Sequence, residues 1–325
     1  MRCLFYSAFL FLIFHFFTFS APFLLNQGHY DSVTDIAKYP YGNIAISVSS
    51  DESVIIWDIT NNKILKTIEL TKGSLSAVAI SPSGKYFVAG TNRGDVYIYD
   101  FNSQSLILND SLHKGKITSI IFPSKDNIFM SAGLDNNIFV YDISAKFVKK
   151  GISMPAKILS LSVSPDKSWI AAGGEKGNIY IISNDTLEIS NVISSAHSDW
   201  VTGVSFSPTG KELASVSWDF KLNIFTMPDG RLIKSIPVNT DKALNSLDWS
   251  NDNKMICISS SNSNIYLYTV SDFSLYGVLS GHKGQVYRTM FFSSDSSLVI
   301  STGADSRVNL WSTKTKELLK SFTGY

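Results

Sequence analysis

Histidines recur along this chain at a nearly constant spacing. Apart from His15, they are His29, His113, His197 and His282, which stand 84, 84 and 85 residues apart. Each of these four stands four residues before an aliphatic residue that opens a strand-like run, namely Val33, Ile117, Val201 or Val286. Because the period and the local context repeat together, the chain is assembled from copies of one structural unit.

Half of that spacing, about 42 residues, divides residues 27–325 into seven units. They begin near Gln27, Thr71, His113, Met154, Ala196, Thr240 and Gly281. Inside a unit, short runs rich in β-branched residues are separated by turns such as Ser207-Pro208-Thr209-Gly210. No apolar pattern of helical period extends over about 12 residues. The sequence therefore predicts an all-β repeat protein with four short strands in each unit.

Four units carry a polar set at fixed spacing. The sets are His29, Ser47, Asp51 with Trp57; His113, Ser131, Asp135 with Tyr141; His197, Ser215, Asp219 with Phe225; and His282, Ser301, Asp305 with Trp311. In these residues the chain resembles the WD-repeat family over residues 27–325. The resemblance implies a single seven-bladed β-propeller of four-stranded antiparallel blades. It also implies that each complete set forms a buried hydrogen-bond chain from Trp through Ser and His to Asp.

The even-numbered units depart from this pattern. Arg93, Lys176 and Asn262 replace the Asp, while Thr71, Met154 and Thr240 stand where the His would be. We expect these three blades to depend on packing alone. Two segments, 22–26 and 317–322, compete to supply the outer strand that closes the ring. The clearer alternation of Leu318 to Phe322 favours closure by the carboxy-terminal segment.

Residues 1–26 form an apolar leader that differs from the rest of the chain. One charge, Arg2, and eight phenylalanines lie within the first 25 residues. Residues 1–21 are typical of a cleaved secretory signal. An uncleaved anchor is less favoured because His15 and Thr18 interrupt the apolar run, which is near the minimum length that spans a bilayer. A wrongly retained intron end, rich in codons for Phe, Leu and Ser, is the third interpretation.

Composition and spacing exclude several kinds of site. With 28 basic and 27 acidic side chains, the chain has no general excess of positive charge for direct nucleic-acid binding. Cys3 and Cys257 are too far apart in sequence for a thiolate metal or redox unit. The His-Ser-Asp sets repeat around a ring, whereas catalysis and metal binding need one converged cluster. We therefore expect no enzyme activity, no cofactor and no metal.

Two tryptophans have no structural role in the repeat pattern. Trp200 immediately precedes an inner strand and Trp218 immediately precedes Asp219, at loops that meet, in this family, on one face of the ring. We call that side the top face and predict that it binds partners. Its other candidate residues are Tyr287, Gln285, Lys157, Lys116, Arg93, Lys176, Leu134 and Leu159. The four cations favour an acidic or phosphorylated segment; in the competing interpretation the two indoles only stack and cover the channel.

The favoured function is a non-enzymatic scaffold, monomeric by itself, that binds other proteins or peptide segments of a multi-subunit complex. Residues 66–99 are similar to a blade of the WD-repeat subunit of the superkiller complex, which implies cytoplasmic RNA decay or nuclear transcription elongation. No membrane contact is expected unless the leader is an uncleaved anchor. A secreted or lumenal ligand-binding propeller, with acceptor sequons at Asn109 and Asn184, is the alternative. A propeller hydrolase is the least favoured, since Glu175 is the single carboxylate predicted beside these loops.

Overall fold

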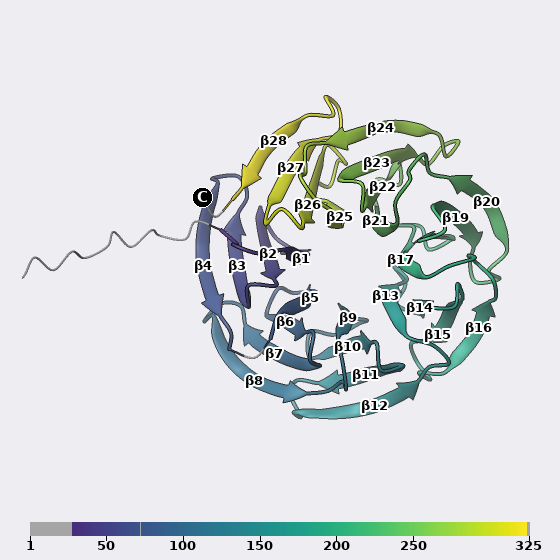
Figure 1. Cartoon of the computed structure of the whole chain (residues 1–325). Helices are drawn as coiled ribbons and strands as arrows, with labels where there is room; N and C mark the ends of the chain where they lie inside the picture. The colour runs from purple at the N-terminus through teal and green to yellow at the C-terminus, as the bar shows by residue number, and fades with distance from the viewer. Residues whose placement is uncertain (1–27, 72, 324–325) are drawn as a thin grey trace, which may run out of the picture.

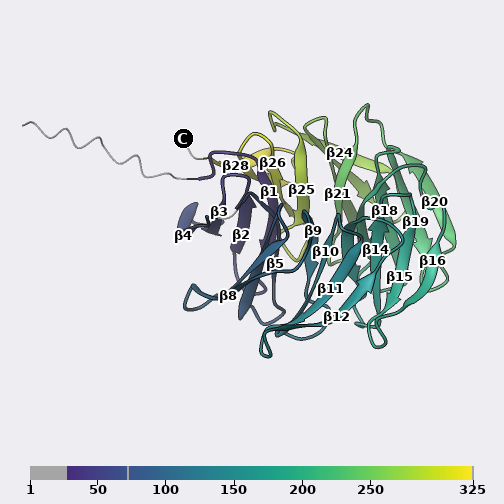
Figure 2. The ribbon, with the colours of Figure 1, turned by 60° about the horizontal axis from the view of Figure 1, so that its bottom comes forward.

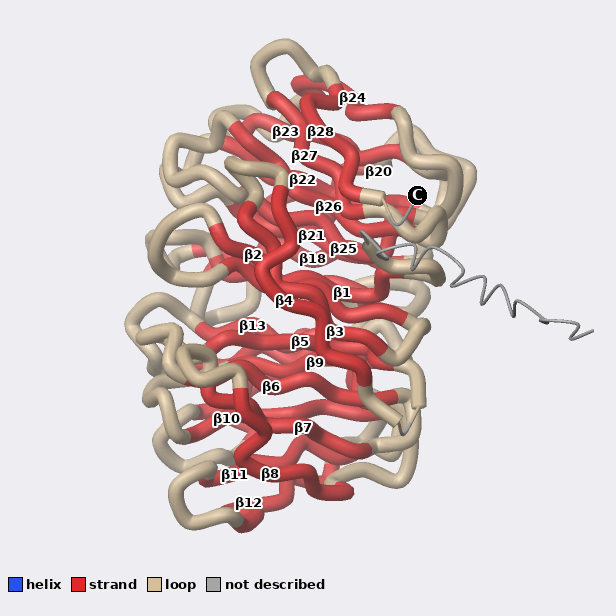
Figure 3. Tube along the Cα trace, turned by 90° about the vertical axis from the view of Figure 1, so that its left-hand side faces the viewer, coloured by secondary structure: helices blue, strands red, loops and turns tan. Residues whose placement is uncertain are grey.

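The computed structural model describes residues 28–71 and 73–323, and it shows a ring of seven four-stranded antiparallel sheets around a central channel (Figure 1). Every sheet is built from four consecutive strands, so that blade one contains β1–β4 and blade seven contains β25–β28. Strands and loops account for all the described residues, with no helix among them (Figure 3). The predicted fold class and blade number are confirmed, while the predicted leader lies outside the described residues.

Strands of equivalent position share their place in the ring. The inner strands are β1 (Val33–Lys38), β5 (Leu75–Ile80), β9 (Ile117–Ile121), β13 (Ile158–Val163), β17 (Val201–Phe206), β21 (Leu244–Trp249) and β25 (Val286–Phe291). The second strands are β2 (Ile44–Ser49), β6 (Tyr86–Thr91), β10 (Ile128–Gly133), β14 (Trp169–Gly174), β18 (Glu212–Ser217), β22 (Met255–Ser260) and β26 (Leu298–Gly303). The third strands are β3 (Ser53–Asp58), β7 (Asp95–Asp100), β11 (Asn137–Asp142), β15 (Ile179–Ser183), β19 (Lys221–Thr226), β23 (Asn264–Thr269) and β27 (Val308–Ser312). The outer strands are β4 (Lys63–Glu69), β8 (Ser105–Ser111), β12 (Phe147–Ser153), β16 (Ile189–Ile193), β20 (Leu232–Pro237), β24 (Leu275–Ser280) and β28 (Leu318–Phe322).

Burial explains the composition of the strands. In every second strand the last five residues are buried, because neighbouring blades cover both faces of that strand. These strands consequently read as near-continuous runs of small and aliphatic residues, as in Trp169–Gly174. The outer strands lie at the rim, where Figure 2 shows them on the outside of the ring, and they are mostly exposed. The hydrophobic core is thus a series of layers between blades.

A β-bulge occurs at the same place in all seven inner strands. The second residue of each strand is skipped in the pairing with the second strand, as between Val33 and Asp35 of blade one. A bulge re-aims the side chain of the extra residue. The bulged residues are Thr34, Ser76, Thr118, Leu159, Thr202, Asn245 and Tyr287.

The ring closes between blade seven and blade one. Strand β28 pairs with β27 as the outer strand of blade seven, which confirms closure by the carboxy-terminal segment; residues 22–26 lie outside the described residues. Phe322 packs edge-on against Trp57 of blade one, with ring centroids 5.4 Å apart. The Lys320 ammonium donates to the Thr60 carbonyl at 2.7 Å, and Lys38 lies over the Phe292 ring. Apolar packing and cations together make this seam.

Candidate functional site

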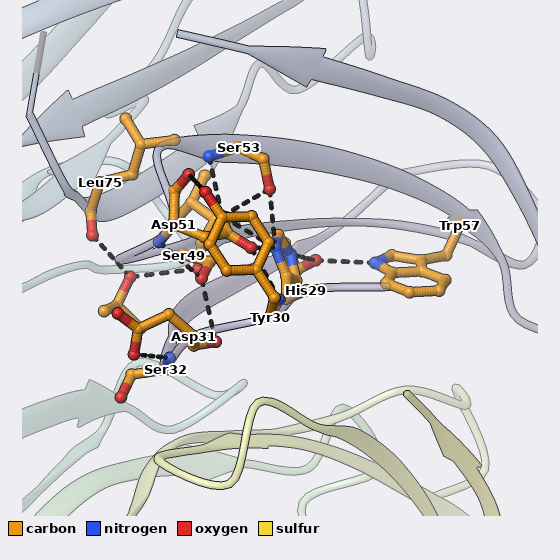
Figure 4. Close-up of polar contacts among 12 residues, drawn as sticks. His29, Tyr30, Asp31, Ser32, Ser49, Asp51, Ser53, Trp57 and Leu75 are labelled. Atoms are coloured by element: carbon orange, nitrogen blue, oxygen red, sulfur yellow. Dashed lines mark hydrogen bonds and ion pairs between the residues drawn. The ribbon is translucent and has the colours of Figure 1, made fainter. Parts of the chain in front are cut away.

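In all four polar sets the His lies within hydrogen-bond distance of the Ser and the Asp, and blade one shows the complete chain (Figure 4). The Trp57 indole N–H donates to Ser47 Oγ at 2.7 Å, and Ser47 Oγ is 2.7 Å from His29 Nε2. His29 Nδ1 lies 3.1 Å from Asp51. An ionised carboxylate only accepts, so Nδ1 carries the proton and Nε2 accepts from Ser47. Asp51 also accepts from the Tyr30 and Ser53 backbone N–H groups, and so holds the two loops together.

The remaining three sets repeat this geometry with one difference. His113, His197 and His282 lie 2.7–2.9 Å from Ser131, Ser215 and Ser301 and 2.9–3.0 Å from Asp135, Asp219 and Asp305. Trp311 donates to Ser301 at 2.8 Å, as Trp57 does in blade one. The Tyr141 hydroxyl instead faces Asp110 at 3.3 Å, and Phe225 has no donor. Blades three and five therefore hold a chain of three groups rather than four.

Electrostatics fits a structural role for these sets. Burial alone would raise the pKa of Asp51, but hydrogen bonds from His29 and Ser53 outweigh it and lower the pKa to about 2. The pKa of Asp219 is likewise lowered to about 2 against the effect of burial, through His197 and backbone N–H groups. Burial lowers the pKa of His113. These are paired buried groups spread around the ring, and no described residues converge into a group of three or more metal-binding side chains.

The even-numbered blades replace the polar set in two different ways. The Ser position holds Ala89, Ala172 or Ile258, and a buried tyrosine stands opposite each of them: Tyr97, Tyr180 or Tyr266. In blades two and four this position packs with Leu70 or Met154, as predicted. Blade six differs, so the expectation of packing alone is wrong there. Asn262 donates to Thr240 at 3.1 Å and to Tyr266 Oη at 2.7 Å, and the Tyr266 hydroxyl donates to the Asn239 carbonyl.

Five of the bulged residues tie each blade to the next. Thr34, Ser76, Thr118, Thr202 and Asn245 donate at 2.6–2.8 Å to the carbonyl of the residue that opens the next inner strand. Leu159 has no donor in its side chain, and the Tyr287 hydroxyl makes no such bond to any described residue. All seven bulged residues line the mouth of the channel, so these two differ only in making no bond to the next blade. A position that is structural in most blades is therefore free for another purpose in blades four and seven.

The structure gathers part of the predicted surface around the channel. Lys116, Leu159, Trp218, Gln285 and Tyr287 line one cavity of about 300 Å³. Trp200 and Trp218 stack, with ring centroids 4.6 Å apart and planes 8° from parallel. The stacking that the competing interpretation predicts is thus present, yet Trp218 remains 39% exposed. The pair is both a cover and an exposed aromatic surface.

The repeat explains why the two indoles meet. In every blade the backbone N–H of the first residue after the second strand donates to the carbonyl of the residue just before the inner strand. In blade five the Trp218 N–H donates to the Trp200 carbonyl at 3.1 Å. The same pairing brings Lys157 to Glu175 in blade four, at 3.2 Å. The Lys157 ammonium also lies 5.8 Å from the centre of the Trp200 ring. Its charge is therefore largely balanced within the blade.

The other predicted residues lie away from the cavity. Lys176 lines a separate hollow with Lys221 and His197. Arg93 is exposed beside Gly73, and Leu134 is half-buried beside the backbone of Lys116. Four cations were predicted to make blades two to four basic, and one of them, Lys116, lines the channel cavity.

Two charged residues that line the cavity were not among the predicted site residues. Arg288 Nε lies 3.5 Å from Asp35 across the seam, and both line the cavity. Burial raises the pKa of Asp35, although Arg288 opposes this shift. Both residues occupy the position after the bulge, where the other blades have Ala77, Ser119, Ser160, Gly203 and Ser246. The signal in the sequence was the pair of opposite charges at this position in the first and last units, which adjoin when the ring closes.

The membrane alternative depends on the leader, which lies outside the described residues. Within residues 28–71 and 73–323, none of the secondary structure is a long apolar helix of the kind that crosses a bilayer. The sequon residue Asn184 uses its amide to donate to the Lys167 carbonyl at 2.8 Å, whereas Asn109 lies exposed on β8.

Comparison with known proteins gives consistent matches. The family described as WD domain, G-beta repeat matches seven segments: 22–58, 62–100, 105–142, 150–183, 190–226, 230–269 and 273–312. A 66 kDa stress protein of Physarum polycephalum is 27% identical over 47% of this chain and 25% of its own length. DDB1- and CUL4-associated factor 13 of Xenopus laevis is 28% identical over 40% of the chain and 30% of its own length.

A guanine nucleotide-binding protein subunit beta of Zea mays is 26% identical over 48% of the chain and 44% of its own length. The matched part of the chain thus spans less than half of each of these relatives. The seven family matches follow one another along the chain and coincide with the repeated strands of the structure. The chain therefore belongs to the WD domain, G-beta repeat family.

Proposed function

We propose that this protein is a non-enzymatic interaction scaffold that binds partner proteins or peptide segments at the mouth of its channel. The observation that carries the proposal is the cavity of about 300 Å³ bordered by the exposed face of Trp218. An indole that is 39% exposed at a concave surface is a typical anchor for a partner. Its stacking on Trp200 holds the ring in place, so that binding costs little further side-chain entropy.

The bulged positions strengthen this proposal. Leu159 and Tyr287 forgo the bond between blades that their counterparts make, and both side chains line the cavity. Apolar and aromatic groups at these places contribute nothing to the belt of hydrogen bonds around the channel. Exposed apolar side chains that the fold does not require are typical of a surface that binds a partner.

The charges at the cavity point to the chemistry of the ligand. Asp35 pairs with Arg288 and Glu175 pairs with Lys157, whereas Lys116 makes no ion pair with any described residue. A segment that places one acidic or phosphorylated group beside a bulky apolar side chain would complement both Lys116 and Trp218. This is narrower than the broad basic surface expected from the sequence.

Relatives support the general role. Two of them are named as an associated factor and a subunit, that is, as proteins that assemble with others. We extend this to the chain as a subunit of a multi-protein assembly in the cytoplasm or nucleus, with a propeller that is monomeric by itself. The similarity of residues 66–99 to a superkiller subunit makes RNA-decay and transcription-elongation complexes the first assemblies to test.

The test compares two exposed apolar side chains. Tagged wild-type protein, Trp218→Ala and the outer-strand control Leu232→Ala, whose leucine is 51% exposed, are used to capture partners that are quantified by mass spectrometry. A hot-spot tryptophan is worth at least about 2 kcal/mol, so Trp218→Ala should lower the recovery of true partners more than tenfold. Leu232→Ala should leave recovery unchanged. Equal recovery by all three proteins would refute the proposed site.

A further inference from the structure

Blade one differs from the others on the bottom face, where the loops between inner and second strands lie. In four blades this loop begins with a serine whose hydroxyl accepts a backbone N–H at 2.9–3.1 Å; these are Ser81, Ser164, Ser207 and Ser250. In blade seven the loop begins with the buried Phe292, and its second residue, Ser293, accepts the N–H at 2.9 Å. Blade three has the buried Phe122. Blade one instead has Tyr39, Pro40 and Tyr41. It gives up a turn-stabilising bond and gains exposed aromatic surface, which favours a binding role over a structural one.

Tyr39 and Tyr41 of this loop and Phe101 of blade two form an aromatic cluster, which we call the platform. Tyr39 stacks on Phe101, with ring centroids 4.2 Å apart, and Tyr41 stands edge-on to Tyr39 at 6.1 Å. Tyr41 is 64% exposed. Tyr39 lies directly over Gly84, where a methyl group would overlap its ring. The turn of blade two thus has glycine at the position where any side chain would collide with the Tyr39 ring.

An open hollow of about 620 Å³ lies beside the platform. Tyr41, Pro82, Lys85 and Tyr86 line it together with the blade-three loop that includes Lys125 and Asp126. The Lys85 ammonium lies 4.9 Å from the centre of the Tyr86 ring. Lys85 and Lys125 make no ion pair with any described residue. The hollow therefore combines aromatic rings with two lysines and a single carboxylate, Asp126.

The lining is rich in hydrogen-bond donors. Tyrosine and serine hydroxyls and the two ammonium groups can all donate, and so can the second N–H of the Asn127 amide, whose first bonds to Asp142 at 3.3 Å. Its one carboxylate, Asp126, is already engaged, because it accepts the Ser83 backbone N–H at 2.8 Å. A complementary ligand must offer mainly acceptors. Helices and paired strands do not, since their carbonyls are already bonded, whereas an extended proline-rich segment has free carbonyls and few N–H groups.

We propose that this bottom-face hollow is a second docking site, which binds an extended proline-rich segment of another protein that carries an acidic residue. Proline rings pack against Tyr41 and Tyr86, backbone carbonyls accept from the surrounding hydroxyls, and the acidic group pairs with Lys85 or Lys125. The polyproline conformation is preformed, so a shallow surface can bind it at low entropic cost. With the channel mouth on the opposite face, the scaffold would hold two partners at once.

Binding of a synthetic probe to the full chain tests the proposal. The probe is a fluorescein-labelled peptide, Pro-Pro-Glu-Pro-Pro-Glu-Pro-Pro, followed by fluorescence anisotropy. Tyr41→Ala and Lys85→Glu should each weaken binding by about tenfold, the loss expected for one aromatic or charged contact. Matched controls are Tyr276→Ala, which removes a tyrosine 40% exposed on β24, and Lys149→Glu on β12. Both should bind like the wild type.

The outcomes separate this site from the proposed function. Trp218→Ala should leave peptide binding unchanged, so either site can fail alone. Anisotropy that does not saturate with the wild type, or equal binding by Tyr41→Ala, would overturn the proposal. Aromatic rings beside lysines also suit single-stranded nucleic acid. If a fluorescein-labelled oligouridylate bound in a Tyr41-dependent way while the peptide did not, the proline-rich ligand would be wrong.

Discussion

Replacing Ser47 with alanine would orphan two buried groups at once. The Ser47 hydroxyl accepts the Trp57 indole N–H and donates to His29 Nε2, each at 2.7 Å. Ser47 and Trp57 are essentially inaccessible to water, at 0% and 2% exposure, and so is His29, at 1%. Neither partner can turn to solvent after the substitution. Each then loses its bond without regaining hydration.

Blade five supplies a matched comparison. There Ser215 bonds to His197 alone, because Phe225 occupies the place of the tryptophan. A buried orphaned polar group costs about 1–3 kcal/mol, so we expect Ser47→Ala to lower the free energy of unfolding by about 4 kcal/mol and Ser215→Ala by about 2 kcal/mol. In the background of Trp57→Phe, the further cost of Ser47→Ala should fall to the blade-five value.

Urea unfolding followed by circular dichroism measures these differences. The wild type and the four variants are compared with one common denaturant slope, because a change in slope would report a change in the surface exposed on unfolding. Equal losses for Ser47→Ala and Ser215→Ala would refute the reasoning. So would a Ser47→Ala cost that does not depend on the residue at position 57.

Two further predictions concern acid stability and the bottom-face turn. The pKa of Asp51 and of Asp219 is about 2 in the fold and about 4 in an unfolded chain, so their stabilising effect is complete above about pH 4 and is lost as the pH falls toward 2. Asp51→Asn should flatten this part of a plot of unfolding free energy against pH; a slope identical to that of the wild type contradicts the assignment. Gly84→Ala should cost about 1–3 kcal/mol, because Gly84 has a φ of 75° and faces the Tyr39 ring. Gly115→Ala, with open space at its Cβ, should melt like the wild type, and equal melting temperatures for both variants would contradict the crowding at Gly84.

The fold could be predicted because its information is repeated. Seven copies of one strand pattern, with histidines in register in alternate units, leave few other architectures that bury these residues. The polar sets could be predicted for the same reason. His29 and Asp51 can bond only if the loops that carry them meet, and the same spacing recurs in three other units. Closure by β28 followed from its alternation, a local property.

Features without a repeat were harder to predict. The stack of Trp200 on Trp218 depends on a loop pairing that exists in every blade but has a visible consequence in one. Asn262 was read as a lost aspartate, although its amide joins Thr240 to Tyr266 once the tyrosine fills the space of the histidine. Arg93 and Lys176 do not line the channel cavity, and a charged residue in a sequence does not show which way its side chain points.

The contact between β28 and blade one must be the last contact between blades to form during synthesis. Lys320 and Thr60 are separated by 260 positions, while neighbouring inner strands elsewhere follow one another after about 42 residues. During synthesis each new wedge can settle against the one before it, and the growing protein remains an open crescent. Its first and last wedges shield each other from water only after residue 322 has been made. A nascent chain halted before Leu318 would leave the Trp57 edge exposed, a natural substrate for chaperones.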